Sequence, residues 1–68
     1  MHKPDKAWEC SRIQQSMRIA LAHLGQARAV AEETFDKEHP ISRTLKERHE
    51  LVFQSLRFIE DQCLQIQD

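Results

Sequence analysis

Two largely apolar ladders at heptad spacing limit what this chain can fold into. The first advances by steps of three and then four residues and consists of Cys10, Ile13, Met17, Ala20, Leu24, Ala27 and Ala31. The second advances by steps of four and then three residues and consists of Leu45, His49, Val52, Leu56, Ile59, Cys63 and Ile66. Such steps place one apolar stripe along each of two helices, so that each stripe faces a partner surface.

The segment between the ladders interrupts the helical pattern. Pro40 disfavours helical backbone at His39 and suits the first turn of a second helix, although Ser42 could also open that helix. Thr44 and Glu47 have the spacing of a capping box, which offers a later start. We expect helices over residues 5–34 and 41–66, joined by a turn at 35–40. Long helices joined by a short turn predict an all-α antiparallel two-helix hairpin that forms a single domain over 1–68.

Pairing the ladders around the turn gives a register in which small side chains repeatedly face large ones, as close packing requires. The facing pairs are Ala31–Leu45, Ala27–His49, Leu24–Val52, Ala20–Leu56, Met17–Ile59, Ile13–Cys63 and Cys10–Ile66. The same register brings basic residues near acidic ones at the ends of the chain, namely Lys3, Lys6 and Arg12 near Glu60, Asp61 and Asp68.

The length and charge of the chain narrow its class. A chain of 68 residues forms a small, marginally stable domain, which self-association often stabilises. It has no run of eighteen apolar residues and no apolar signal segment at its start, so we expect a cytoplasmic protein. The net charge is −1. Arg12, Arg18 and Arg28 point in different directions on a helix, which disfavours a nucleic-acid partner.

No residue pattern predicts catalysis or cofactor binding. The histidines lack metal-ligand spacing, and the serines lack a glycine-rich loop that could form an oxyanion hole. Cys10 and Cys63 lie about one layer apart on facing ladders, so a disulfide would require adjustment and we expect buried thiols. We therefore expect no enzyme activity, no cofactor and no metal ion.

Apolar residues left outside the ladders are the candidate partner-binding residues. They are Trp8, Ile19, Val30, Leu51, Phe53 and Phe58. The first three recur every eleven residues on one side of the first helix, and the others lie on the back and flank of the second. Scattered exposed apolar residues are ordinary on proteins. Their alignment on both helices nevertheless predicts an interface, either with a second copy in a four-helix bundle or with another helical protein.

The segment 13–24, which reads IQQSMRIALAHL, together with the chain length and the hairpin, resembles the small co-chaperones of type III secretion needle subunits. That resemblance implies a helical hairpin that pairs with a helical-repeat chaperone and keeps the needle subunit from polymerising in the cytoplasm. It carries over no individual site residue. The expected function is therefore that of a non-enzymatic interaction module, a small chaperone or assembly adaptor that docks a helical partner.

The length and the two heptad ladders are also similar to the plasmid copy-control hairpin that dimerises into a four-helix bundle and binds paired RNA loops. This resemblance implies a homodimeric RNA-binding regulator. Such a function needs a positive helical face, and the arginines of the first helix are not aligned to form one. RNA binding is therefore the alternative to the protein-docking function.

Overall fold

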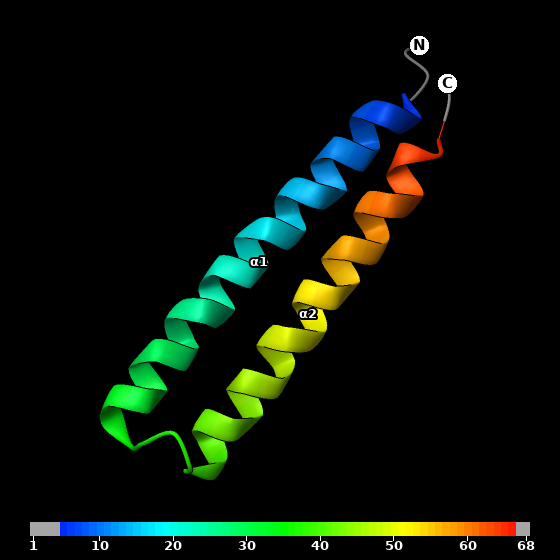
Figure 1. Cartoon of the computed structure of the whole chain (residues 1–68). Coiled ribbons are helices and arrows are strands. Elements are labelled where there is room, and N and C mark those ends of the chain that lie inside the picture. The colour runs from blue at the N-terminus through cyan, green and yellow to red at the C-terminus, as the bar shows by residue number, and fades with distance from the viewer. Residues whose placement is uncertain (1–4, 67–68) are drawn as a thin grey trace.

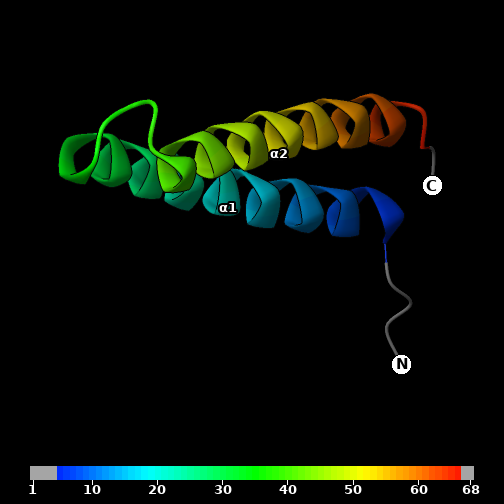
Figure 2. The same cartoon turned by 90° about the horizontal axis from the view of Figure 1, so that it is seen from below.

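The computed structural model describes residues 5–66, which form two antiparallel helices, α1 (Lys6–Thr34) and α2 (Pro40–Leu64), joined by a short turn (Figure 1). The two helices lie side by side in a single layer, seen from a second direction in Figure 2. The molecule measures 51 × 22 × 11 Å. The predicted all-α antiparallel hairpin is confirmed. Its second helix begins one residue earlier and ends two residues earlier than expected.

Side chains rather than water cap the first turn of each helix. The Asp5 carboxylate accepts hydrogen bonds from the backbone N–H groups of Ala7 at 2.9 Å and Trp8 at 3.3 Å. His39 caps α2 in an extended conformation, with φ −62° and ψ 141°, as the following proline requires. Its Nδ1 accepts from the Ile41 N–H at 3.1 Å, which places the ring proton on Nε2. The Thr44–Glu47 capping box therefore does not begin this helix.

The turn is fixed by contacts among its own residues. The Asp36 carboxylate accepts from the backbone N–H groups of Glu38 at 2.8 Å and His39 at 2.9 Å. The Phe35 and His39 rings stack with their centroids 4.2 Å apart. These local bonds satisfy the backbone donors of Glu38 and His39 and hold His39 where it can cap α2.

The second ladder is confirmed over most of its length. Its members from Leu45 to Cys63 are buried or half-buried against α1, with Leu56 only 5% exposed. Ser42 extends the stripe by one step toward the turn. Ile66, the last predicted member, is exposed at 38%. The inner stripe of α2 therefore consists of Ser42, Leu45, His49, Val52, Leu56, Ile59 and Cys63.

The first ladder is wrong at every second position. Ile13, Ala20 and Ala27 are exposed. The inner stripe of α1 instead consists of Cys10, Gln14, Met17, Leu21, Leu24, Arg28 and Ala31. The predicted facing pairs that involve the three exposed residues are wrong as well. Gly25 and Arg28, rather than Ala27, lie against His49, and the Arg28 Nη1 is 3.3 Å from its Nδ1.

The rotation of α1 about its axis explains this difference. A stiff helix presents one set of residues to its partner, and burying Leu21 removes far more apolar surface from water than burying Ala20. Arg28 tolerates an inner position because its aliphatic stem can line the interface while the guanidinium reaches the edge. The same rotation carries Ile13 to the surface, where it is 49% exposed.

A single layer of two helices leaves a small core. Among residues 5–66 the buried apolar side chains are Cys10, Ala31 and Leu56. Cys10 and Cys63 are free thiols; Cys10 is buried as expected, whereas Cys63 is only half-buried. Ser42 is 2% exposed, and its hydroxyl has no hydrogen-bond partner within the described residues. The hairpin therefore has little apolar burial with which to stabilise itself.

Candidate interaction surfaces

The inner stripes divide the rest of the hairpin surface into two broad faces. On each helix, the residues that directly follow an inner residue turn about 100° to one side, and those that directly precede one turn about 100° to the other. Arg18 follows Met17 and Glu60 follows Ile59, and their side chains form an ion pair across the two helices at 2.8 Å. The following residues of both helices therefore share one face, and the preceding residues share the other.

The face made by the following residues is rich in charge, and we call it the charged face. It consists of Ser11, Gln15, Arg18, Ala22, Gly25, Ala29, Glu32, Arg43, Lys46, Glu50, Phe53, Arg57, Glu60 and Leu64. Half of these side chains are charged, and acidic and basic groups are interspersed.

The face made by the preceding residues, which we call the apolar face, has a different character. It consists of Glu9, Ile13, Ser16, Ala20, His23, Ala27, Val30, Ile41, Thr44, Arg48, Leu51, Ser55, Phe58 and Gln62. Apart from Glu9, which is half-buried, every one of these residues is exposed. This face carries one acidic residue, Glu9, and one residue of the lysine and arginine type, Arg48. Glu9 forms an ion pair with Arg12 at 3.4 Å.

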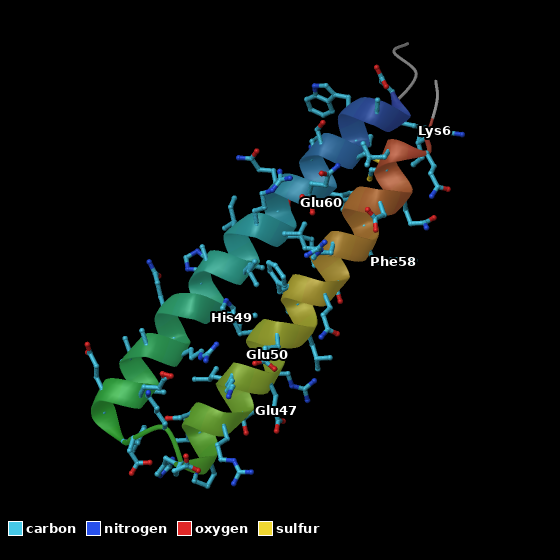
Figure 3. All side chains as sticks on the ribbon, in the orientation of Figure 1. Lys6, Glu47, His49, Glu50, Phe58 and Glu60 are labelled. Atoms are coloured by element: carbon cyan, nitrogen blue, oxygen red, sulfur yellow. The ribbon has the colours of Figure 1, made fainter. Side chains whose placement is uncertain are left out.

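The structure brings three of the six predicted partner-binding residues together. Val30, Leu51 and Phe58 lie on the apolar face, where Phe58 is 64% exposed. Figure 3 labels the Phe58 side chain on α2. Phe53 lies on the charged face. All six candidates are exposed, but they do not form one surface.

The other two candidates lie elsewhere on α1. Trp8 follows Ala7 on the side of the charged face, and the Arg12 guanidinium lies over its ring at 5.1 Å. Ile19 lies on the outer side of α1, away from α2, because it is two positions past the inner residue Met17. The eleven-residue line of Trp8, Ile19 and Val30 therefore winds across the helix from one face to the other.

The sequence reasoning missed Ile13 and Ile41 as exposed surface residues. Both belong to the apolar face and are exposed at 49% and 46%. Ile13 was assigned to the interior because the predicted stripe of α1 had the wrong rotation. Both residues directly precede an inner residue, and this position places them on the apolar face. It can be recognised only once the inner stripes are known.

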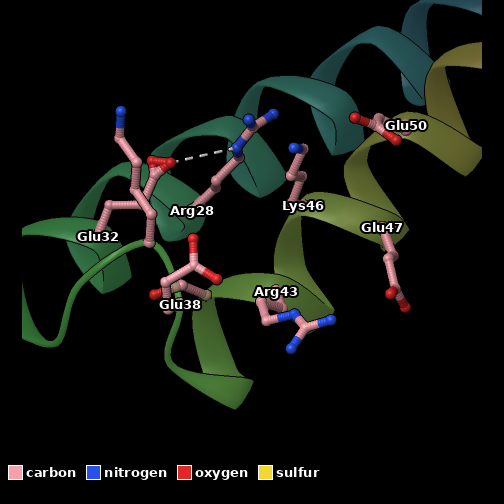
Figure 4. A pocket seen from close by; sticks show the side chains of 9 residues that line it. Arg28, Glu32, Glu38, Arg43, Lys46, Glu47 and Glu50 are labelled. Atoms are coloured by element: carbon pink, nitrogen blue, oxygen red, sulfur yellow. Dashed lines mark ion pairs between the residues drawn. The ribbon is translucent and has the colours of Figure 1, made fainter.

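A charged cleft of about 580 Å³ opens near the turn (Figure 4). Its lining residues are Arg28, Glu32, Lys37, Glu38, Ser42, Arg43, Lys46, Glu47 and Glu50. Four are basic and four acidic, so the cleft favours neither an anion nor a cation. The Arg28 Nε lies 3.5 Å from the Glu32 carboxylate, and Arg28 also donates to the Nδ1 of His49, which places the proton of that ring on Nε2.

The arginines of α1 are each close to an acidic side chain. Arg12 pairs with Glu9, Arg18 with Glu60 and Arg28 with Glu32. The predicted register placed Arg12 near Glu60, but Arg12 pairs with Glu9 and Glu60 pairs with Arg18. Lys3 and Asp68, which the same prediction also named, lie outside the described residues.

Searches for chemical sites and for relatives give negative results. Within residues 5–66, no three His, Cys, Asp or Glu side chains are placed to hold a metal ion. Neither helix of this described range is long and apolar enough to cross a membrane. Comparison with protein-family models, with curated proteins and with solved structures finds no match. The class that can be stated is therefore that of a small two-helix hairpin.

Proposed function

We propose that this chain is a non-enzymatic interaction module that docks a helical protein partner. The observation that carries the proposal is the distribution of its apolar side chains. Among residues 5–66, three apolar residues are buried, and five of the eleven exposed large apolar side chains lie on the apolar face, namely Ile13, Val30, Ile41, Leu51 and Phe58. Contiguous exposed apolar surface on a small protein typically marks a binding site.

The mechanism is coverage of the apolar face by helices of the partner. Two parallel rows of exposed side chains, one from each helix, give a flat surface into which the ridges of partner helices can pack. Ala20 and Ala27 lie on this surface and allow a close approach, while Val30, Leu51 and Phe58 provide bulk. Burial of such side chains stabilises a complex by about 1.5–3 kcal/mol for each that becomes fully covered.

In finer terms, we propose the role of a small cytoplasmic chaperone or assembly adaptor, like the needle-subunit co-chaperones that the sequence resembles. The hairpin shape and the length support this role. The RNA-binding alternative has less support, because the basic groups of the charged face are interspersed with acidic ones and each arginine of α1 has an acidic neighbour.

Affinity capture with matched variants tests the proposal. Tagged wild-type chain and Leu51→Glu are used as bait in an extract of the native host, and each captured protein is purified and titrated calorimetrically. Gln54→Glu is the control, since Gln54 is exposed on the same helix but outside the apolar face. We expect a helical partner, or the chain itself, to bind wild type and the control and to lose most of its affinity for Leu51→Glu. Equal binding to all three, or no binding protein and a strict monomer, contradicts the proposal.

A further inference from the structure

We propose that the partner of the apolar face is a second copy of this chain, packed antiparallel across a twofold axis that passes by Ala20 and Ser55. This inference rests on the proposed interaction function and names its partner. The product is a four-helix bundle whose core forms between the two apolar faces.

The apolar face is large enough for a stable dimer. The hairpin is a flat plate of 51 × 22 Å, so the face covers on the order of 1,000 Å². Stable protein interfaces bury roughly 800 Å² on each partner. The charged face has the same area, but its association would remove seven charged side chains from water, which is costly unless each is paired.

The position of the axis follows from contacts within the hairpin. Arg18 pairs with Glu60, and Gly25 lies against His49. Residue 20 falls between the two contact points on α1, and residue 55 falls between them on α2. Ala20 and Ser55 are therefore nearly level, and residue 20 is the midpoint of α1. Both side chains are small, which lets two faces approach closely at the axis.

A twofold axis at this level makes the middle of the face complementary to itself, while at its end Val30 lies opposite Glu9 of the second copy. On α1 it places Ile13 opposite Ala27 of the second copy and Ala20 opposite its own equivalent. On α2 it places Leu51 opposite Phe58 of the second copy. Large side chains thus meet small ones along α1, while the largest apolar groups meet each other along α2.

Charge also favours the antiparallel arrangement. Arg48 lies opposite Gln62 of the second copy, and the two copies of Arg48 are separated by fourteen residues of helix, roughly 21 Å at 1.5 Å per residue. In a parallel arrangement Leu51 would instead face His23 and Phe58 would face Ser16, so apolar groups would be buried against polar ones. The antiparallel dimer leaves Trp8 and Phe53 uncovered for a further partner.

Two identical substitutions on opposite faces test the proposal. Ala20→Glu brings two carboxylates together at the axis, whereas Ala22→Glu adds the same charge to the exposed charged face of the same helix. We expect Ala20→Glu to weaken dimerisation by about 100-fold or more in sedimentation equilibrium, because each buried carboxylate lacks a partner. Ala22→Glu is expected to change it by less than about threefold. An equimolar mixture of Ala20→Glu and Ala20→Lys is expected to restore the dimer.

A cross-linking experiment keeps the test decisive if Ala20→Glu loses helicity by circular dichroism. Under mild oxidation, Ala20→Cys is expected to form a covalent dimer and Ala22→Cys is not. Equal dimerisation of Ala20→Glu and Ala22→Glu, or equal cross-linking of the two cysteine variants, overturns this register but leaves the proposed function standing. A wild-type chain that is monomeric yet binds another helical protein overturns only the self-association. A monomer that binds nothing overturns both.

Discussion

The two helices of the hairpin use their apolar residues differently. The inner stripe of α2 contains four branched aliphatic residues, Leu45, Val52, Leu56 and Ile59, whereas that of α1 contains two, Leu21 and Leu24. Each inner stripe also includes two polar residues, namely Gln14 and Arg28 on α1 and Ser42 and His49 on α2. At the same time α1 exposes Ile13, Ile19 and Val30 to solvent.

The rotation of α1 about its axis decides which of its apolar residues pack against α2. Ile13 by itself would gain more than Gln14 from leaving water, but the rotation that buries Gln14 also buries Leu21 in place of Ala20. The rotation that exposes Ile13 also gives the apolar face its row of Ile13, Ala20 and Ala27. The rotation of α1 therefore leaves Ile13 at the surface, where the proposed partner would cover it. Four substitutions probe this contrast between the helices, each measured by chemical unfolding at a fixed chain concentration.

Leu56→Ala is expected to have the largest effect, because Leu56 is the most buried large side chain of α2, at 5% exposed. Truncating a buried leucine costs about 2–4 kcal/mol of unfolding free energy, enough to unfold much of a marginal hairpin. Leu64→Ala is the control, since Leu64 is 84% exposed on the same helix. Similar losses for the two variants would show that α2 is not the packing element described.

Ser42→Ala removes the buried polar side chain at the end of the α2 stripe that lies next to the turn. The Ser42 hydroxyl is buried without a hydrogen-bond partner among the described residues, so its removal ends a desolvation cost. We expect the variant to stabilise the hairpin by about 1–2 kcal/mol, with alanine's higher helix propensity included. Ser11→Ala changes an exposed position on α1. We expect it to gain only the stability that comes from alanine's higher helix propensity. A loss of stability in Ser42→Ala would reveal an unrecognised partner for the hydroxyl.

Gln14→Leu converts a polar position of the α1 stripe to the type found on α2. Gln14 is half-buried between the helices, and its Oε1 accepts an exposed hydrogen bond from Arg18 at 3.3 Å. We expect roughly 1 kcal/mol of added stability from the apolar burial. The same change at the exposed neighbour Gln15 should leave the unfolding free energy almost unchanged. If both variants behave alike, the assigned rotation of α1 is wrong.

Gly25→Ala is expected to give the smallest gain. A methyl group at this position would lie 3.5 Å from the His49 Nε2, an ordinary contact distance, so no atom has to move. Helix propensity then stabilises the variant by about 0.5–1 kcal/mol. Ala29→Gly, the reverse change on the same face, should lose a similar amount. Destabilisation by Gly25→Ala would mean that His49 packs more tightly against α1 than described.

The sequence predicted the hairpin well because its determinants are local. The turn depends on Pro40, which excludes helical backbone at His39, and the α2 stripe is the one apolar ladder with suitable spacing on that helix. On α1, two ladders have equally good spacing, since Ile13, Ala20 and Ala27 directly precede Gln14, Leu21 and Arg28. Only packing against α2 decides between the two ladders. The more apolar ladder, with Ile13, Ala20 and Ala27, was the wrong choice.

The candidate surface was predicted only in part for the same reason. Trp8, Ile19 and Val30 were grouped by an eleven-residue repeat, yet a face of the hairpin follows the seven-residue repeat of the inner stripes. Leu51 and Phe58 are seven residues apart and were grouped correctly on one side of α2. The contribution of α1 to the apolar face depended on the rotation that the sequence left open.

The central claim, that a second copy covers the apolar face, is tested most directly by the mass of the chain in solution. Sedimentation equilibrium measures this mass for wild type and for Ala20→Glu. The chain concentration is varied over about 100-fold around the micromolar range. We expect wild type to reach twice its 8.0 kDa chain mass while Ala20→Glu stays near 8.0 kDa. A wild-type mass of 8.0 kDa at every concentration would contradict the claim.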